Sequence, residues 1–327
     1  GGFKKEVYWV KHGGDDELEV PMFLRPTSET PMYTMFSLWI RSHADLPLKT
    51  FQIVNTFRYE TKQTRSFIRV REIHFFEAHT AHADEQGATE QIAEDAQMVQ
   101  RLLHDLCFPA IVSKRPVWDT FPGAWYSTAV DAVMPNGRTL QVATYHHYRD
   151  QWARAFDLSY EDASGQTRYC HQTTFGMSER LLGAVVGMHG DDNGLIIPPS
   201  IAPIQVVIMP VAAHTDSNVM PRVSQLAEHL SGSGIRVHLD ARDLRPGAKH
   251  YDWEIKGVPV RLEIGPRDLA SGNCVVSLRT GGKSEVPLDG ITQTVTGLLD
   301  SVSDELRTRS HSYASELIRP FPGLIQN

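Results

Sequence analysis

The spacing of apolar residues predicts a mixture of helices and strands in the first part of the chain. Residues 1–80 have the pattern of short strands around one helix over roughly 30–43, where apolar side chains recur at intervals of three and four (Met32, Met35, Phe36, Trp39). A clearer amphipathic helix is predicted at 89–107, with Thr89 as its N-cap. Its apolar face is formed by six residues (Ile92, Ala96, Val99, Leu102, Leu103, Leu106).

From 117 to 175 the alternation of apolar and polar residues predicts antiparallel strands. PNGR, at 135–138, separates two alternating runs and is a strong signal for a hairpin. The segment GMSERLLGAVVGMHG that follows has the pattern of a strand end leading into a helix.

The pattern changes at 195–211, LIIPPSIAPIQVVIMPV. Pro198 and Pro199 interrupt regular structure, and IQVVIMPV is typical of a strand buried on both faces. Helices and strands then follow one another along the chain. A helix near 219–231 precedes the strand IRVHLD, a helical stretch HYDWEIKG precedes the strands VPVRLEIG and CVVSLR, and a last helix lies near 291–317. This alternation favours a second, compact α/β domain with a mixed sheet, and we place the boundary at 198–203.

Composition narrows the class of protein. The 327 residues are 41% apolar and 22% charged, with a formal net charge of −7, as in ordinary globular proteins. No apolar run is long enough to span a membrane, and GGFKKEVYWV does not form a signal peptide. Because it lacks an initial Met, we expect the N-terminus to lie upstream. Three scattered cysteines exclude a disulfide framework and a CxxC zinc site, and they favour a reducing compartment such as the cytoplasm.

The segment FRYETKQTRSFIRVRE, residues 57–72, concentrates positive charge in this acidic chain. Residues two apart in a strand face the same way, so Arg58 is predicted to share a face with Glu60, and Arg69 with Arg71. A hairpin here would gather guanidinium groups, which bind phosphate and carboxylate oxygens bidentately. The chain contains no GxxxxGK[ST] loop, GxGxxG, GxSxG or HExxH. If it handles a nucleotide, side chains on strands must therefore do the binding.

Long stretches of the sequence resemble one family. They are RPTSET, FRYETKQTRSFIRVREI with FFEAHTAHA, FPGAWYSTAVDAVMPNGRTLQVATYHH, GMSER with HGDDNGLIIPPSIAPIQVV, and RPGAKHYDWEIKGVPVRLEIGPRDL. From about residue 6 to about 310 the chain resembles the class II aminoacyl-tRNA synthetases, specifically prolyl-tRNA synthetases of the archaeal/eukaryotic type. The implied fold is α/β (α+β). It consists of an antiparallel-sheet catalytic domain (1–199), a mixed-sheet anticodon-binding domain (200–318) and a tail (319–327).

The resemblance implies that proline and ATP form prolyl-adenylate, and that the prolyl group then passes to tRNA(Pro). Arg58 would contact the proline carboxylate and the α-phosphate, and Arg180 the far end of the triphosphate; both are the expected catalytic residues. The other expected ATP-binding residues are Glu60, Arg69, Gln141 and Thr144. Gln141 would also help to place Mg²⁺, which prefers oxygen ligands.

The resemblance also implies a proline pocket. Thr27 and Glu29 would receive the secondary ammonium of proline, with Arg58 at its carboxylate. The remaining expected proline-binding residues are Phe75, Glu77, His79, Phe121, His146 and Ser178. His146 and His147 are adjacent in a strand and would point to opposite faces, which disfavours a metal site there.

In the second domain, basic and aromatic residues surround the helix predicted at HYDWEIKG. The resemblance makes this the tRNA anticodon-binding region, with basic groups on phosphates and an aromatic beside unpaired bases. The expected tRNA-binding residues are Arg245, Lys249, Trp253 and Lys256.

Three features depart from the family pattern. Motif 1, which builds the homodimer interface, would lie upstream of residue 1. The usual C-terminal domain and its four-cysteine zinc site are not expected at 319–327. Tyr145, Tyr148 and Trp152 are bulkier than the pattern and are expected to reshape the adenylate pocket.

Two alternative functions therefore stay open. A paralogue could activate proline or an analogue for specialised metabolism, or a non-catalytic paralogue could sense tRNA or an amino acid. The set Thr27, Glu29, Arg58 and Arg180 argues against a sensor, and RPGAKHYDWEIKG argues against an enzyme that does not use tRNA. A threonine-specific relative is disfavoured because no cysteine falls in the pocket segments.

Overall fold

The computed structural model describes residues 5–60 and 62–319, which form two compact units. The first unit contains most of residues 5–184, and the second contains 185–319 together with the short segments 102–109 and 134–137. Most of the predicted tail at 319–327 lies outside the described residues.

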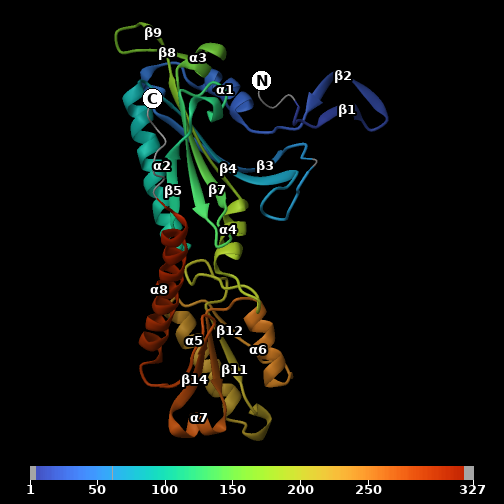
Figure 1. Ribbon diagram of the computed structural model, residues 1–327, viewed down its shortest axis with the longest axis vertical. Helices are drawn as coiled ribbons and strands as arrows, with labels where there is room; N and C mark the ends of the chain where they lie inside the picture. Colours follow the sequence, from blue (N-terminus) through green and yellow to red (C-terminus); the bar gives the residue numbers. More distant parts are fainter. Residues whose placement is uncertain (1–4, 61, 320–327) are drawn as a thin grey trace. The chain divides into compact units, whose positions relative to one another are not determined.

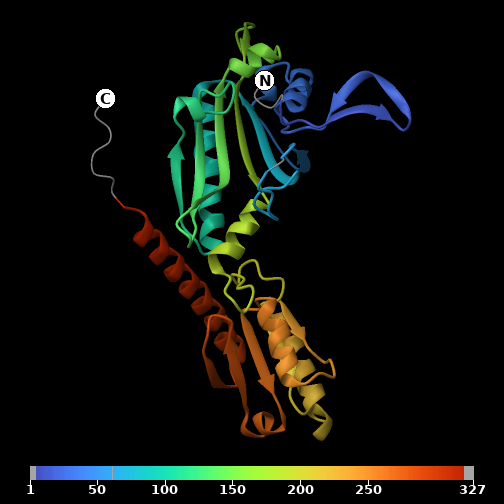
Figure 2. The same ribbon diagram turned by 45° about the vertical axis from the view of Figure 1, so that its right-hand side comes forward.

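A six-stranded antiparallel sheet forms the first unit, in the order β3-β4-β10-β7-β6-β5 (Figure 1). The strands are β3 (Leu48–Phe57), β4 (Glu72–His82), β5 (Ala110–Lys114), β6 (Tyr126–Val133), β7 (Thr139–Arg149) and β10 (His171–Ser178). Two-stranded ribbons accompany it: β1 (Trp9–Gly13) with β2 (Asp16–Phe23), and β8 (Ser159–Glu161) with β9 (Thr167–Tyr169). The β1–β2 ribbon stands away from the sheet in Figure 2.

Helices and short helical turns complete this unit. They are α1 (Glu29–Trp39), η1 (His43–Asp45), α2 (Glu85–Asp105), η2 (Val117–Asp119), α3 (Gln151–Ala155) and α4 (Arg180–His189). The helix predicted at 30–43 ends at Trp39, since Ile40 is already extended. The helix predicted at 89–107 begins four residues earlier, and the expected cap at Thr89 is wrong. Asp84 Oδ1 accepts a hydrogen bond from Gly87 N at 2.8 Å, whereas the Thr89 hydroxyl donates to Glu85 O inside the helix.

The prediction of two strands running through the basic segment is also wrong. Strand β3 ends at Phe57 and β4 begins at Glu72, so the arginines lie in the connection between them. The backbone ladder closes with Arg58 N donating to Arg71 O at 2.9 Å. Beyond that bond, Tyr59 N donates to Glu6 O, which draws the chain away from the sheet.

A mixed five-stranded sheet forms the second unit, in the order β12-β11-β13-β14-β15. Its strands are β11 (Val206–Pro210), β12 (Val237–Leu239), β13 (Val260–Ile264), β14 (Asn273–Leu278) and β15 (Lys283–Pro287). Strands β12, β11 and β13 run parallel to one another. Strand β14 is antiparallel to β13, and β15 is antiparallel to β14. As predicted, β11 is buried; it lies between β12 and β13.

Helices cover both faces of this sheet. They are η3 (Ala213–Thr215), α5 (Val219–Gly232), α6 (Pro246–Ile255), α7 (Pro266–Ser271) and α8 (Ile291–Leu317). Apolar residues of α5 and α8 pack with Val206, Ile208 and Leu262 in one core. On the other face, Trp253 of α6 packs with Val207 and Met209. No helix among the described residues is long and apolar enough to cross a membrane.

A buried carboxyl on α2 makes the stability of the first unit depend on pH. Asp95 accepts a hydrogen bond from Gln91 Nε2 at 2.9 Å, and burial raises the pKa of Asp95 to about 6. Between pH 4 and 6 the folded chain therefore retains a proton that the unfolded chain has lost, so the stabilising contribution of the neutral carboxyl is lost as pH rises.

We expect Asp95→Asn to raise the free energy of unfolding at pH 7 by up to about 3 kcal/mol, because the amide never ionises. At pH 3, below the pKa of the unfolded carboxyl, the variant and the wild type should be about equally stable, since both side chains are neutral in both states. Denaturant unfolding at the two pH values measures the difference. Glu90→Gln, a change at an exposed carboxyl of the same helix, is the control and should change stability by less than about 0.5 kcal/mol. An equal gain from Asp95→Asn at both pH values would contradict this account.

Candidate active site

The register of the catalytic sheet places polar residues in rows across one face. One row pairs Gln52 with Glu77, Glu77 with Gly176, and Gly176 with Thr144. The next row, two residues away, pairs His79 with Thr174, Thr174 with His146, and His146 with Ser127. Because residues two apart face the same way, both rows lie on the same side of the sheet. The opposite face carries Phe76, Phe175 and Tyr145 in contact with one another.

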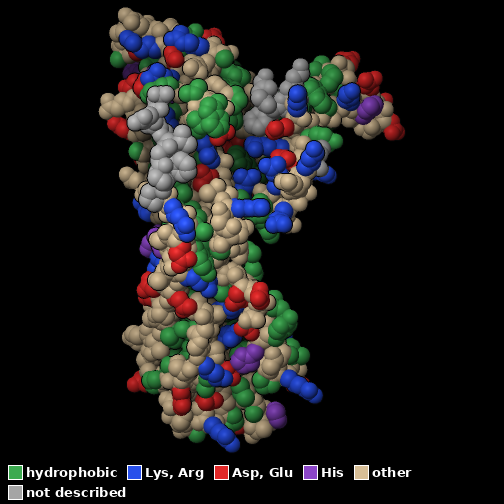
Figure 3. Space-filling view, viewed as in Figure 1, with side chains coloured by type: hydrophobic (Ala, Val, Ile, Leu, Met, Phe, Trp, Pro, Cys, Tyr) green, Lys and Arg blue, Asp and Glu red, His purple; other side chains and the backbone are tan. Residues whose placement is uncertain are grey.

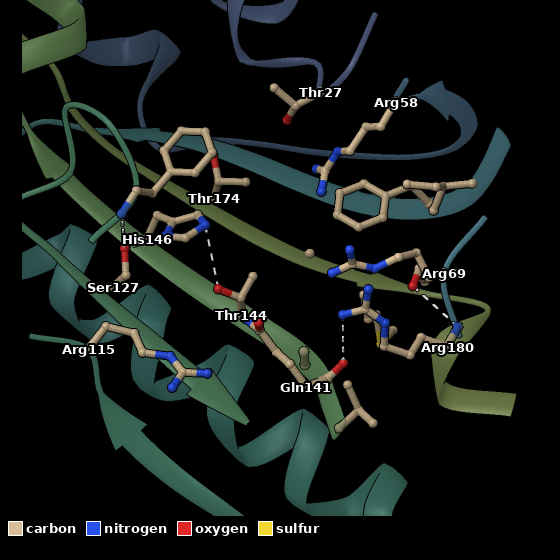
Figure 4. Close-up of a pocket in the computed structure, with 18 of the residues that line it drawn as sticks. Thr27, Arg58, Arg69, Arg115, Ser127, Gln141, Thr144, His146, Thr174 and Arg180 are labelled. Carbon is tan, nitrogen blue, oxygen red and sulfur yellow. Dashed lines mark hydrogen bonds between the residues drawn. The ribbon is translucent and has the colours of Figure 1, made fainter. Parts of the chain in front are cut away.

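A cavity of about 410 Å³ opens over these rows (Figure 4). The sheet provides its floor, and the β3–β4 connection and the segment 115–122 provide walls. Twelve of the predicted ATP- and proline-binding residues line it: Thr27, Glu29, Arg58, Glu60, Arg69, Phe75, Phe121, Gln141, Thr144, His146, Ser178 and Arg180.

Three arginines converge on one side of the cavity, namely Arg58, Arg69 and Arg180 (Figure 4). Arg58 Nε donates to Pro26 O at 3.2 Å. Arg180 donates from Nε to Ile68 O at 2.9 Å and from Nη1 to Gln141 O at 3.3 Å. Burial, followed by the positive charges of Arg58 and Arg69, lowers the pKa of Arg180 below its usual range. Burial likewise lowers the pKa of Arg58. The arrangement concentrates positive charge where a bound anion would relieve the repulsion.

Two buried carboxylates lie at the other end of the site. Thr27 Oγ1 donates to Glu29 and lies 3.1 Å from Glu77 Oε1. Tyr148 OH donates to Glu29 Oε1 at 3.2 Å, which fixes the carboxylate that lines the cavity. Burial by itself would raise the pKa of Glu77, but hydrogen bonds and charge from His79, Ser28 and Gln52 hold it below its usual value. Glu77 therefore stays ionised behind Thr27.

An aromatic wall closes this end. The rings of Phe121 and His146 stack with centroids 4.5 Å apart. His146 Nδ1 lies 2.7 Å from Ser127 Oγ, which also accepts a hydrogen bond from Phe121 N at 3.0 Å. Burial lowers the pKa of His146 to about 3, so the ring is neutral at physiological pH. The wall consequently adds no positive charge beside Glu29.

Known proteins match both units of the chain. Residues 8–189 match the family described as "tRNA synthetase class II core domain (G, H, P, S and T)", and residues 205–298 match "Anticodon binding domain". The chain is 53% identical over 321 residues to proline–tRNA ligase of Thermococcus kodakarensis, covering 97% of this chain and 67% of the relative. It is 51% identical over 311 residues to the same enzyme of Methanoregula boonei, covering 94% of this chain and 65% of the relative.

The solved structure of Giardia lamblia prolyl-tRNA synthetase in complex with prolyl-adenylate has a TM-score of 0.93 to this chain. The two are 39% identical, and the match covers 96% of this chain and 67% of that chain. The chain belongs to the prolyl-tRNA synthetases, class II enzymes that join proline to its tRNA. It spans about two thirds of the length of these relatives. The predicted fold class, an antiparallel-sheet catalytic domain followed by a mixed-sheet anticodon-binding domain, is confirmed.

Two expected proline-binding residues are placed differently from the prediction. Glu77 and His79 do not line the cavity, although they lie on the same face of the sheet. The Thr27–Ser28 backbone covers Glu77, with Ser28 N donating to it at 3.2 Å, and the ring of Tyr33 covers His79. Their place in the prolyl-tRNA synthetase site is behind the residues that face the substrate.

The three bulky side chains at positions 145, 148 and 152 do not line the cavity. Tyr145 and Tyr148 are buried beneath the sheet and helix surfaces, and Trp152 stacks on Phe156. The expected effect on the shape of the adenylate pocket would therefore have to come through the residues that they contact. Tyr148 contacts residues that do line the cavity: its hydroxyl donates to Glu29, and its ring packs against Phe121 and His146 with centroids 6.1 Å apart in each pair.

The predicted tRNA-binding helix is α6, and two of its four predicted residues are buried. Lys249 Nζ donates to Asp240 O at 2.9 Å, and Trp253 Nε1 donates to Asp240 Oδ2 at 2.7 Å. Both hold α6 on the end of β12, which makes them poorly suited to contact RNA. Arg245 precedes the helix and is exposed, while Lys256 Nζ lies over the Trp253 ring at 4.4 Å.

Sequence reasoning missed several residues of the cavity. Arg115 binds Asp131 through Nη2 at 3.0 and 3.1 Å, and Ser127 and Thr174 complete the row of His146. The rows could have been found only with the strand register. Gly176 had a weak signal, as the first residue of GMSER.

We expect Gly176→Ala to weaken activation of proline. A Cβ at this position would lie 2.8 Å from Phe75 Cζ and would push the ring into the cavity. The Michaelis constant for proline in ATP–pyrophosphate exchange should rise at least about fivefold, the effect of roughly 1 kcal/mol. Gly232→Ala makes the same change in open space and should leave exchange at the wild-type level. Equal exchange in the two variants would show that the Phe75 ring is free to move aside.

Proposed function

We propose that this chain activates proline with ATP and transfers the prolyl group to tRNA(Pro) in the cytoplasm. The observation that carries the proposal is the single cavity that joins an arginine cluster to a buried carboxylate end. The arginines suit the triphosphate and the carboxylate of proline, and Glu29 suits a secondary ammonium. All three cysteines are free and buried, as a reducing compartment requires.

The arginines are proposed to work by positioning and charge. Arg58 lies between the two ends of the cavity and would hold the proline carboxylate against the α-phosphate. Arg69 and Glu60, whose side chains pair at 3.4 Å, would hold ATP from the β3–β4 connection, with Gln141 and Thr144 on the sheet. Arg180 would take the far phosphates. No covalent enzyme intermediate is needed, since nucleophile and electrophile are both substrates.

The pocket for proline is proposed to be small because its walls are fixed. Thr27 and Glu29 would accept the ammonium protons, and Phe75, Phe121, His146 and Ser178 would surround the ring. Glu77 and His79 would act as positioning residues, since they support Thr27 and Thr174 by hydrogen bonds. A neutral His146 suits a place beside the proline ring because it does not repel the ammonium.

Magnesium fits the site as an ion carried by the nucleotide. The described residues contain no group of three or more His, Cys, Asp or Glu side chains that could hold a metal ion. Mg²⁺ commonly retains waters and binds substrate phosphates with few protein ligands. Gln141, whose side chain lines the cavity beside Arg180, would offer it an oxygen.

Proline-dependent ATP–pyrophosphate exchange, compared with charging of tRNA(Pro), tests the proposal. We expect both reactions. Arg58→Ala should reduce exchange by about 100- to 1,000-fold, since it removes a donor worth roughly 3–4 kcal/mol to the transition state. Arg65→Ala, an exposed arginine of the same connection, is the matched control and should leave exchange unchanged. No exchange with proline would overturn the proposal, and exchange without charging would favour a specialised paralogue.

We further propose that the chain forms a homodimer. Strand β3 is an edge of the catalytic sheet, and Phe51 and Ile53 are 71% and 72% exposed on it. An exposed apolar sheet edge is typical of an interface. Sedimentation at micromolar concentration should give twice the mass of the chain, and Phe51→Glu should shift the protein towards the monomer. A monomeric wild type would contradict this.

A further inference from the structure

Trp118 is an exposed indole at the rim of the cavity that no step of activation uses. It lies in the short turn η2 and is 86% exposed, although it lines the cavity. Its ring makes no aromatic or cation contact with any residue in the described ranges 5–60 and 62–319. Large aromatic side chains exposed beside a binding site are common at contacts with a partner.

The backbone around Trp118 is fixed although the ring is exposed. Asp119 N donates to Pro116 O at 2.9 Å, and the Thr120 hydroxyl donates to the same oxygen at 3.0 Å. Arg115 anchors the start of the turn, because its N donates to Ser127 O and its guanidinium binds Asp131. The backbone that carries the indole is thus fixed at the rim, which lowers the entropy lost when a ligand stacks on the ring.

Trp118 lies outside the part of the cavity that the small substrates need. Phe121, three residues along, already closes the amino-acid end by stacking on His146. The phosphate-binding arginines lie on the opposite side of the cavity from Arg115 (Figure 4). The remaining substrate is tRNA, whose terminal ribose must reach the adenylate from the solvent side.

The chemistry of an unpaired nucleotide matches the rim. Unpaired bases commonly stack on aromatic side chains, and basic side chains hold the adjoining phosphates. Lys62 and Arg65 are exposed in the β3–β4 connection, and Figure 3 shows Lys and Arg side chains gathered over it. Trp118 thus offers a stacking surface on the segment 115–122, and Lys62 and Arg65 offer positive charge on the β3–β4 connection across the cavity from it.

We propose that Trp118 stacks on the 3′-terminal base of tRNA(Pro) and thereby positions the terminal ribose for prolyl transfer. This inference rests on the proposed function of the same cavity. It assigns Trp118 to the transfer step alone, so that activation of proline proceeds without it.

The first experiment compares the two half-reactions in Trp118→Ala. Pyrophosphate exchange should stay within twofold of the wild type, whereas kcat/KM for tRNA(Pro) in charging should fall about tenfold, as expected for one lost base stack. Trp118→Phe keeps a stacking ring and should recover most of the loss. Val117→Ala changes the neighbouring side chain, which is 93% exposed and does not line the cavity, and should match the wild type in both assays.

A second experiment identifies the base. Binding of tRNA(Pro) with and without its 3′-terminal nucleotide is measured for the wild type and Trp118→Ala. The wild type should bind the shortened tRNA about tenfold more weakly, and Trp118→Ala should bind both tRNAs equally. If removing the nucleotide weakened binding by the same factor in Trp118→Ala as in the wild type, the assignment would be overturned, because Trp118 and the terminal base would then not interact.

Other outcomes also decide the question. Exchange that falls together with charging in Trp118→Ala would overturn the inference and make Trp118 a part of the adenylate pocket. Unchanged charging would overturn it as well. Absence of proline-dependent exchange in the wild type would contradict the proposed function and, with it, the transfer role of Trp118; the tRNA-binding experiment then decides separately whether Trp118 contacts the terminal base.

Discussion

The gathering of three guanidinium groups beside one cavity is the constraint on which the catalytic unit depends. Like charges held this close repel, and the burial of Arg58 and Arg180 removes much of the water that would screen those two. The chain holds Arg180 in place with backbone carbonyl oxygens, those of Ile68 and Gln141. A carbonyl orients a guanidinium without cancelling its charge, so the positive potential is retained for a substrate. Arg242 and Arg279 of the second unit contrast with this, since they bind the carboxylates of Asp240 and Asp191.

The proline end of the site is built from a continuous set of buried hydrogen bonds. It runs from Tyr148 through Glu29 and Thr27 to Glu77, and from Tyr33 through Thr174 to His79. A buried polar group without a partner costs about 1–3 kcal/mol, so each member fixes the rotamer of the next. This accounts for the rigidity of a pocket that must accept one small amino acid. Glu77 and His79 contribute to it from behind, at a distance from the substrate.

Much of the fold could be predicted from the sequence, because the apolar periods of α8, β11 and the 135–138 hairpin reflect local physics. The course of the basic segment could not be predicted in this way. After β3 ends at Phe57, Tyr59 N bonds to Glu6 O, and these two residues are far apart in the sequence. The start of α2 depended on Asp84, one residue before the helix. The tRNA-binding role expected of Lys249 and Trp253 follows from the family resemblance, which does not reveal burial; both side chains hold α6 on Asp240.

The site residues were identified by motif, but their division of labour follows from strand register. Motifs placed Thr27, Arg58 and Arg180 in the cavity without showing what lies between them. The register sets Gly176 between Glu77 and Thr144, so the absence of a side chain there leaves room for the Phe75 ring. A larger residue would push that ring into the cavity, and the ring would then occupy space between the carboxylate end and the arginines. The small residue in the middle of the sheet therefore keeps the cavity open between the carboxylate end and the arginines, as the proposed binding of an amino acid beside a nucleotide requires.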